Sequence, residues 1–152
     1  MKVSLYTDGA SIGNPGAAGI AYLLKDARGT VIASGCEPIG VATNNQAEYH
    51  ALLRGLMQAR ALGATEVEWF SDSELLVKQW SGDYQVHHPA LRQLLQQAKA
   101  LAEGVQVIPH AVARNSLPEM AQVDRWARQA ARKQLRKRSE PTSAPCTERG
   151  LT

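Results

Sequence analysis

The sequence lacks the features that define several large classes of protein. Its apolar runs are far shorter than the roughly 20 residues needed to span a bilayer, and its first ten residues do not have the shape of a signal peptide. Two cysteines, at positions 36 and 146, are too few for a disulfide framework and do not have the spacing of a zinc site. The chain also has no Gly-x-x-x-x-Gly-Lys loop. We therefore expect a cytoplasmic protein with no membrane segment and no organic cofactor.

What is present is an average globular composition with an uneven distribution of charge. The 152 residues suffice for one domain with a core, but not for two ordinary domains. Residues 1–124 contain nine Lys and Arg against twelve Asp and Glu, whereas residues 125–138 contain seven basic residues and no acid. Those seven are Arg125, Arg128, Arg132, Lys133, Arg136, Lys137 and Arg138. A basic segment beside an acidic body hints at a polyanionic partner, and a solvated helix face is an equally good explanation.

Hydrophobic periodicity and turn signals predict five strands and four helices. The predicted strands are 2–7, 19–24, 30–37, 66–70 and 105–108, with a turn-like run at 8–16. The predicted helices are about 43–62, 73–81, 90–102 and 118–138. The order βββαβααβα predicts one α/β domain over residues 1–138, with a five-stranded mixed sheet and helices on both faces. Residues 139–152 are predicted to be a disordered tail.

Two acids follow strands that we expect to be parallel neighbours. Asp8 follows the strand predicted at 2–7, and Asp72 follows the strand predicted at 66–70, where a helix begins. The ends of adjacent strands lie about 4.8 Å apart, and open α/β sheets place their sites at this edge. Taken singly, Asp72 is more readily interpreted as a helix cap and Asp8 as a turn residue.

Two further acids stand at the head of apolar helix faces. Small or apolar residues follow Glu48 at positions 52, 55, 59 and 62, and follow Asp124 at positions 127, 131 and 135. Charged side chains are rarely buried without a partner, so both acids break the pattern of their helices. A partner arginine or a frayed helix end is the alternative explanation for each. One shared site explains all four acids more simply than four coincidences do.

Electrostatics decides what such a site must contain. Two carboxylates about 5 Å apart repel each other by roughly 3 kcal/mol at an effective dielectric constant near 20. Three or four of them would destabilise the fold or become protonated unless cations neutralised them. Magnesium prefers carboxylate, water and phosphate oxygens, and pairs of ions about 3.5–4 Å apart assist phosphodiester displacement. The four acids therefore predict a divalent metal site.

Three ordered motifs carry a resemblance to a known family. They are Thr7-Asp8-Gly9-Ala10-Ser11-x-Gly13-Asn14-Pro15-Gly16, Thr43-Asn44-Asn45-Gln46-Ala47-Glu48-Tyr49-x-Ala51-Leu52 and Ser71-Asp72-Ser73. Over about residues 1–135 the chain resembles type 1 ribonuclease H, and its predicted strand and helix order agrees with that fold. The resemblance implies a ribonuclease H-like fold and cleavage of the RNA strand of an RNA–DNA hybrid.

The resemblance also implies a set of site residues. The metal-binding and catalytic acids of the family correspond to Asp8, Glu48, Asp72 and Asp124, with two Mg²⁺ or Mn²⁺ ions bound beside the substrate. In such enzymes a metal-activated water attacks phosphorus in line and leaves 3′-hydroxyl and 5′-phosphate ends. Contacts to the RNA 2′-hydroxyls, which distinguish RNA from DNA, and to a DNA phosphate are implied for Gly9, Ala10, Ser11, Asn14, Thr43, Asn44 and Asn45. From the residues alone, the three asparagines are equally interpretable as turn or helix-start chemistry.

The chain departs from many relatives in two places. Where they carry a histidine ahead of the fourth acid, ten residues before Asp124, this chain has Arg114. An arginine cannot transfer a proton, so any catalytic contribution of Arg114 is through its charge on a phosphate. The short segment 82–89 also leaves no room for the basic loop that many relatives insert there. We expect the basic face of the last helix to take its place on the nucleic-acid backbone. Three of the four histidines, His87, His88 and His110, are expected to be loop or strand-end residues.

Two other functions stay open at this stage. The main alternative is a catalytically weak module that binds RNA–DNA hybrids, and a third possibility is the nuclease domain of a larger polymerase or domesticated element. We expect a monomer that acts without sequence preference, because contacts to backbone and 2′-hydroxyls carry no base information.

Overall fold

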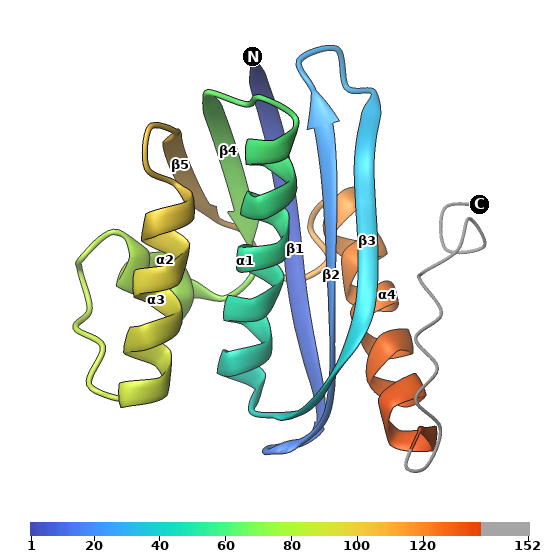
Figure 1. The fold of residues 1–152 in the computed structure, drawn as a ribbon. Helices are drawn as coiled ribbons and strands as arrows, with labels where there is room; N and C mark the ends of the chain where they lie inside the picture. The colour runs from blue at the N-terminus through green and yellow to red at the C-terminus, as the bar shows by residue number, and fades with distance from the viewer. Residues whose placement is uncertain (138–152) are drawn as a thin grey trace.

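A computed structural model of the chain describes residues 1–137, so the predicted tail and two residues named above, Arg138 and Cys146, lie outside the described residues. The strands are β1 (Lys2–Gly13), β2 (Gly16–Asp26), β3 (Val31–Ala42), β4 (Glu66–Ser71) and β5 (Gln106–Ala111). The helices are α1 (Asn44–Ala61), α2 (Glu74–Trp80), α3 (Pro89–Leu101) and α4 (Pro118–Arg136). The element order predicted from the sequence is confirmed (Figure 1).

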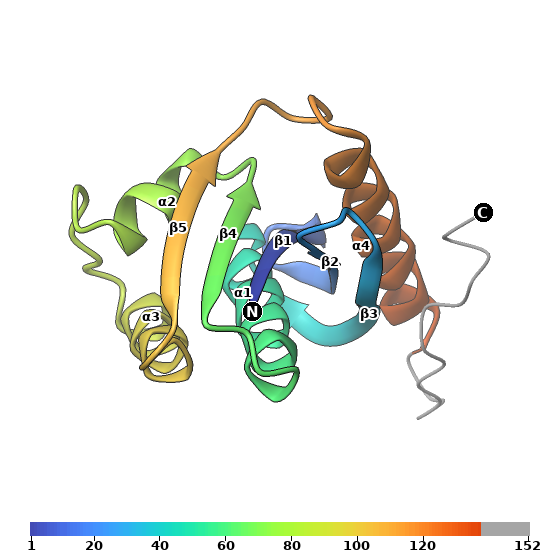
Figure 2. The same cartoon turned by 90° about the horizontal axis from the view of Figure 1, so that it is seen from above.

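The strands form one mixed sheet in the order β3-β2-β1-β4-β5. The first three strands are antiparallel neighbours, and β4 pairs in parallel with both β1 and β5. Helices α1 and α3 lie on one face of the sheet, and α4 lies on the other, over β1, β2 and β3 (Figures 1 and 2). The predicted α/β architecture with helices on both faces is therefore confirmed.

The first hairpin is longer than the sequence predicts. The run 8–13 was expected to be a turn, but it continues β1 and pairs with β2 from Asp8 opposite Ala21 to Gly13 opposite Gly16. The hairpin connection is reduced to Asn14 and Pro15. Ladder pairing with β2 supplies the backbone hydrogen bonds of this run, and this outweighs the weak strand preference of its Gly, Asp and Ser residues.

Helix α1 is fixed at its start by a complete capping box. The Thr43 hydroxyl accepts a hydrogen bond from the Gln46 backbone N–H, and the Gln46 side chain accepts one from the Thr43 N–H. From there the helix buries Tyr49, Leu52 and Leu56 against the sheet, within the larger of the core clusters. The beginning of α1 is therefore held in one place over β1.

Helix α4 covers the opposite face with a second core cluster. Its buried side chains include Met120, Val123, Trp126 and Ala130, which pack against β1 and β2. A Cβ at Gly19 on β2 would lie 2.4 Å from a backbone nitrogen of α4, so the helix and strand approach closely there. Among the described residues, no helix has the length and apolar character of a membrane span.

Candidate active site

Asp8 and Asp72 come together where the parallel pairing of β1 with β4 ends. The last paired residues are Tyr6 and Phe70, and each acid lies two positions further along its chain. Asp8 lies inside β1 and not at its end, because the strand continues along β2; this corrects the sequence prediction. Asp72 follows directly after β4, as predicted. Asp8, Glu48 and Asp72 each offer a carboxylate oxygen, and these three oxygens lie within 4.8 Å of one another.

Glu48 reaches this point because α1 touches β1 at a glycine. A Cβ on Gly9 would lie 2.4 Å from the carbonyl carbon of Ala47, so only a glycine allows this approach. The contact sets Glu48, one residue further along, beside Asp8. The Glu48 side chain is buried, with 9% of the residue exposed. Within residues 1–137, its buried Oε1 has no hydrogen-bond partner.

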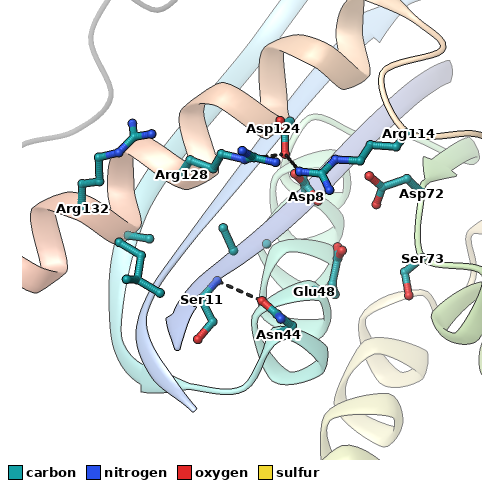
Figure 3. A pocket seen from close by; sticks show the side chains of 14 residues that line it. Asp8, Ser11, Asn44, Glu48, Asp72, Ser73, Arg114, Asp124, Arg128 and Arg132 are labelled. Atoms are coloured by element: carbon teal, nitrogen blue, oxygen red, sulfur yellow. Dashed lines mark hydrogen bonds and ion pairs between the residues drawn. The ribbon is translucent and has the colours of Figure 1, made fainter. Parts of the chain in front are cut away.

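Asp124 approaches from α4 on the far side of Asp8. Arg128 lies one turn further along the helix and donates a hydrogen bond from Nε to Asp124 Oδ1 at 3.2 Å. The Arg114 Nη2 atom lies 3.7 Å from the same oxygen. Figure 3 shows the Arg114 guanidinium between Asp124 and Asp72, above Asp8. Asp124 is thus near the other acids but bound to two arginines.

The charges of these acids are costly in the absence of a cation. Burial, with the charges of Asp72 and Asp124, raises the pKa of Asp8 to about 8. Burial and the Asp8 charge raise the pKa of Glu48 well above its usual value. Burial also raises the pKa of Asp72, and the Arg114 guanidinium partly opposes that rise. Without a cation the cluster therefore retains protons that free carboxylates would lose.

The donor set suits a hard divalent cation. All three converging groups are carboxylates, and carboxylate oxygens are the side-chain ligands that Mg²⁺ and Mn²⁺ prefer. The unpaired Oε1 of Glu48 supports this interpretation, because a buried acceptor without a partner is costly. An ion at this place would both satisfy that oxygen and remove the repulsion between the acids.

The acids stand in a pocket of about 630 Å³, which also includes several predicted substrate-binding residues. Gly9, Ala10, Ser11 and Asn44 line it. The Ser11 backbone N–H donates to Asn44 Oδ1 at 3.0 Å, and the Asn44 backbone N–H donates to Asn14 Oδ1 at 3.1 Å. These bonds join the end of the first hairpin to the start of α1. Thr43 caps α1, and Asn45 is exposed in its first turn.

The structure adds pocket residues that sequence reasoning did not assign to the site. These are Ile12, Ser73, Arg128, Ala131 and Arg132. The i,i+4 spacing of Asp124 and Arg128 was the available signal for the most important of them. The histidines are elsewhere: the His88 Nδ1 caps α3, and the ring of His110 stacks on Phe70 within the sheet.

Comparison with known proteins agrees with this arrangement. The family model described as reverse transcriptase-like matches residues 6–122. A ribonuclease H of Thermus thermophilus is 31% identical, with 99% of this chain and 92% of the relative covered. The chain belongs to the ribonuclease H family.

Other relatives are more similar in sequence but longer. The bifunctional protein Rv2228c of Mycobacterium tuberculosis is 50% identical over 103 residues, which are 67% of this chain and 28% of that protein. Ribonuclease HI of Halobacterium salinarum is 42% identical over 103 residues, covering 68% of this chain and 52% of that protein. The chain therefore spans between about a quarter and a half of these two relatives.

Solved structures match nearly the whole described chain. The N-terminal ribonuclease H domain of the same Mycobacterium tuberculosis protein superposes with a TM-score of 0.84 at 41% identity, covering 90% of this chain and 97% of that one. A second, LC11-RNase H1 in complex with an RNA/DNA hybrid, has a TM-score of 0.80 at 32% identity, covering 88% and 99%. The fold predicted from the motifs is that of type 1 ribonuclease H.

Proposed function

We propose that this protein is an endoribonuclease that hydrolyses the RNA strand of RNA–DNA hybrids with divalent metal ions. The observation that carries the proposal is the convergence of Asp8, Glu48 and Asp72 within 4.8 Å inside a pocket, in a chain of this family. A similar solved protein is described in complex with an RNA/DNA hybrid, which supports the substrate class. The expected products carry 5′-phosphate and 3′-hydroxyl ends.

The four acids are proposed to hold two ions, Mg²⁺ or Mn²⁺. Asp8, Glu48 and Asp72 form the deeper set, and Asp124 with Asp8 is proposed to complete the second set. Bound divalent ions supply charge stabilisation at the scissile phosphate and a more acidic water. Arg114 is proposed to contribute positive charge at the mouth of the pocket, where a phosphate would enter.

The wall made by β1 and α1 is proposed to recognise the RNA strand. The backbone at Gly9–Ser11 and the amide side chains of Asn14, Asn44 and Asn45 supply groups that suit 2′-hydroxyls. The Ser11–Asn44–Asn14 hydrogen bonds support this role, because they hold that wall rigid. Thr43, held in the capping box, is proposed to contact a phosphate of the DNA strand.

We also propose that residues 1–138 form the ribonuclease H domain and that the protein acts as a cytoplasmic monomer. The mass of the purified protein, measured by light scattering, checks the monomer directly. A mass near 16.5 kDa is expected, and twice that value would contradict this part of the proposal.

The decisive experiment is cleavage of an end-labelled RNA–DNA hybrid. Wild type is expected to cut the RNA strand with Mg²⁺ or Mn²⁺ and to be inactive with EDTA. Asp8→Asn and Asp72→Asn are each expected to lower the rate by at least about 10²-fold, because each removes a charge that the reaction requires. Leu135→Gln, a change of an exposed residue at the far end of α4, is a control expected to cleave normally.

The same assay tests the alternative of a catalytically weak binding module. Tight hybrid binding by wild type with no cleavage under any metal condition would favour that alternative. Cleavage that does not depend on metal, or that persists in both Asp variants, would contradict the proposed chemistry.

A further inference from the structure

Asp72 lies beyond the backbone pairing that aligns its strand with the strand carrying Asp8. The parallel ladder of β1 and β4 ends at Tyr6 and Phe70, two positions before each acid. After that point β1 continues along β2, whereas β4 ends one residue before Asp72. Main-chain bonds between β1 and β4 therefore do not set the position of Asp72 relative to Asp8 and Glu48, and other contacts must do so.

A buried hydrogen bond joins β1 to β4 directly beside Asp8. The indole N–H of Trp69 donates to Thr7 Oγ1 at 2.9 Å, and both residues are fully buried. Thr7 immediately precedes Asp8, and Trp69 lies three residues before Asp72. The Trp69 ring also packs edge-on against Trp80 of α2, with ring centroids 5.8 Å apart. The strand that leads to Asp72 is thus tied to the neighbour of Asp8.

A second buried hydrogen bond joins α1 to α2 beside Glu48. The Tyr49 hydroxyl donates to Gln79 Oε1 at 2.5 Å, and both residues are buried. Tyr49 follows Glu48 directly, and Gln79 belongs to the helix that begins just after Asp72. Burial raises the pKa of Tyr49 to about 12, so its hydroxyl keeps its proton at neutral pH and can donate. The helix that follows Asp72 is thus tied to the neighbour of Glu48.

We propose that Thr7 and Tyr49 are positioning residues that hold the segment around Asp72 at the spacing from Asp8 and Glu48 that a metal ion requires. This inference rests on the proposed function, because it concerns the same metal site. A buried polar group that loses its partner is costly, so each bond strongly favours one arrangement of the elements that it joins. The pocket lining includes neither Thr7 nor Tyr49, so both act through the acids and not by touching substrate.

The test removes each hydroxyl with little change in side-chain shape, as Thr7→Val and Tyr49→Phe. Mn²⁺ binding to the full chain is measured by calorimetry and by the electron paramagnetic resonance signal of free Mn²⁺. Each single variant is expected to bind Mn²⁺ about 3-fold more weakly than wild type, and the double variant Thr7→Val/Tyr49→Phe about 10-fold more weakly. Groups that orient metal ligands without touching the ion commonly have effects of this size.

Cleavage of the RNA–DNA hybrid gives a second readout. The double variant is expected to lower kcat about 10-fold, because small displacements of the reacting groups slow the reaction. KM for the hybrid should stay within about twofold of wild type, since the pocket wall made by β1 and α1 is unchanged. A purely structural role for the two hydroxyls would lower the melting temperature without this separation of kcat from KM.

Two control variants remove the same kinds of hydroxyl elsewhere. Thr65→Val breaks the hydrogen bonds of Thr65 with Met1, which lie just ahead of the same two strands at their opposite end. Tyr6→Phe alters a buried tyrosine whose hydroxyl interacts with Ser4 of its own strand and so joins no two elements. Both controls are expected to bind Mn²⁺ within about twofold of wild type. Thr7→Ser keeps the hydroxyl and should also bind as wild type does.

The inference is overturned if Thr7→Val and Tyr49→Phe, shown to be folded by circular dichroism, bind Mn²⁺ as tightly as the two controls. It is also overturned if Thr7→Ser is impaired as much as Thr7→Val. Should Thr7→Val fail to fold, the comparison of Tyr49→Phe with Tyr6→Phe decides. Failure of wild type to bind Mn²⁺, or to cleave a hybrid, would instead overturn the proposed function.

Discussion

At the scale of single residues, burial and neighbouring negative charges together raise the pKa values of acids in the site. Asp8 is almost fully enclosed, and Asp72 and Asp124 add negative charge around it, so its pKa rises to about 8. In the unfolded chain its pKa is near 3.8. The folded protein therefore binds a proton more tightly than the unfolded chain does, and this difference makes its stability depend on pH.

We predict that the metal-free protein becomes less stable as pH rises. A group whose pKa is raised by folding stabilises the fold fully below about pH 4 and loses that contribution as pH rises through about 8. In EDTA, the free energy of unfolding of wild type should fall by about 2 kcal/mol between pH 6 and pH 8. Urea titrations at several pH values measure it.

Asp8→Asn is the matched variant for this prediction, since an amide has no charge to titrate. Its stability should change less over the same range of pH, and in EDTA it should exceed that of wild type at about pH 8. With Mg²⁺ present, the loss in wild type should shrink or reverse, because the ion binds the deprotonated acids. Parallel pH profiles for the two proteins in EDTA would contradict this account of Asp8.

At the scale of elements, the contact of β1 with the first turn of α1 is the feature that builds the site. Asp8 belongs to the strand and Glu48 to the helix, and Gly9 lets the two backbones meet. The capping box at Thr43 fixes the start of α1, and the Ser11–Asn44 hydrogen bond joins it to β1. The distance between the two carboxylates is therefore set by backbone packing and not by side-chain flexibility.

Gly9→Ala tests this junction. The new methyl group would lie 2.4 Å from the Ala47 carbonyl carbon, and a backbone atom cannot move aside without shifting α1. We expect a loss of about 1–3 kcal/mol in the free energy of unfolding, as for other overpacked positions. We also expect a clearly weaker first Mn²⁺ site, measured by calorimetry.

Gly55→Ala is the control for Gly9→Ala, because it adds the same methyl group between the same two elements. There the nearest atom is the Leu5 side chain at 2.5 Å, which has freedom to adjust. Its Mn²⁺ affinity should match that of wild type. Normal metal binding by Gly9→Ala would show that the junction does not set the spacing of the acids.

At the scale of the whole molecule, positive and negative charges line opposite walls of one pocket. Three of the four acids come from β1, α1 and the end of β4, whereas the arginines come from α4 and the loop before it, and Asp124 lies among them on α4. Figure 3 shows Arg128 over the acids and Arg132 further along α4, pointing away from them. The basic face predicted from the sequence thus begins at the pocket and continues outward along the helix.

This arrangement predicts a specific effect of salt on hybrid binding. Arg132→Gln/Arg136→Gln should weaken binding measured in EDTA and flatten its dependence on salt by roughly 0.9 in the logarithmic slope for each phosphate that is no longer neutralised. Lys2→Gln/Arg28→Gln removes the same charge at the opposite end of the sheet and should leave the slope unchanged. Equal slopes in the two variants would argue that α4 does not bind the backbone.

The first hairpin and Asp124 show most clearly how much of the structure can be predicted from the sequence alone. The parallel pairing of β1 with β4 was predictable, because hydrophobic runs and the helix between them leave few other topologies. The extension of β1 to Gly13 was not, since its residues favour turns until β2 supplies a ladder partner. Asp124 was expected to join the other three acids, with a partner arginine as the alternative; the structure shows it beside Asp8 and also paired with Arg114 and Arg128, which come from two separate segments.

The sequence by itself determined the order of the elements, the apolar faces and the identity of the four acids, since these depend on local patterns of spacing and polarity. Only the tertiary structure decided how close the carboxylates stand, that the buried Oε1 of Glu48 has no hydrogen-bond partner among the described residues, and which acid pairs with arginine. Those properties depend on distances between segments far apart in the chain, and packing at contacts such as Gly9 against Ala47 sets them.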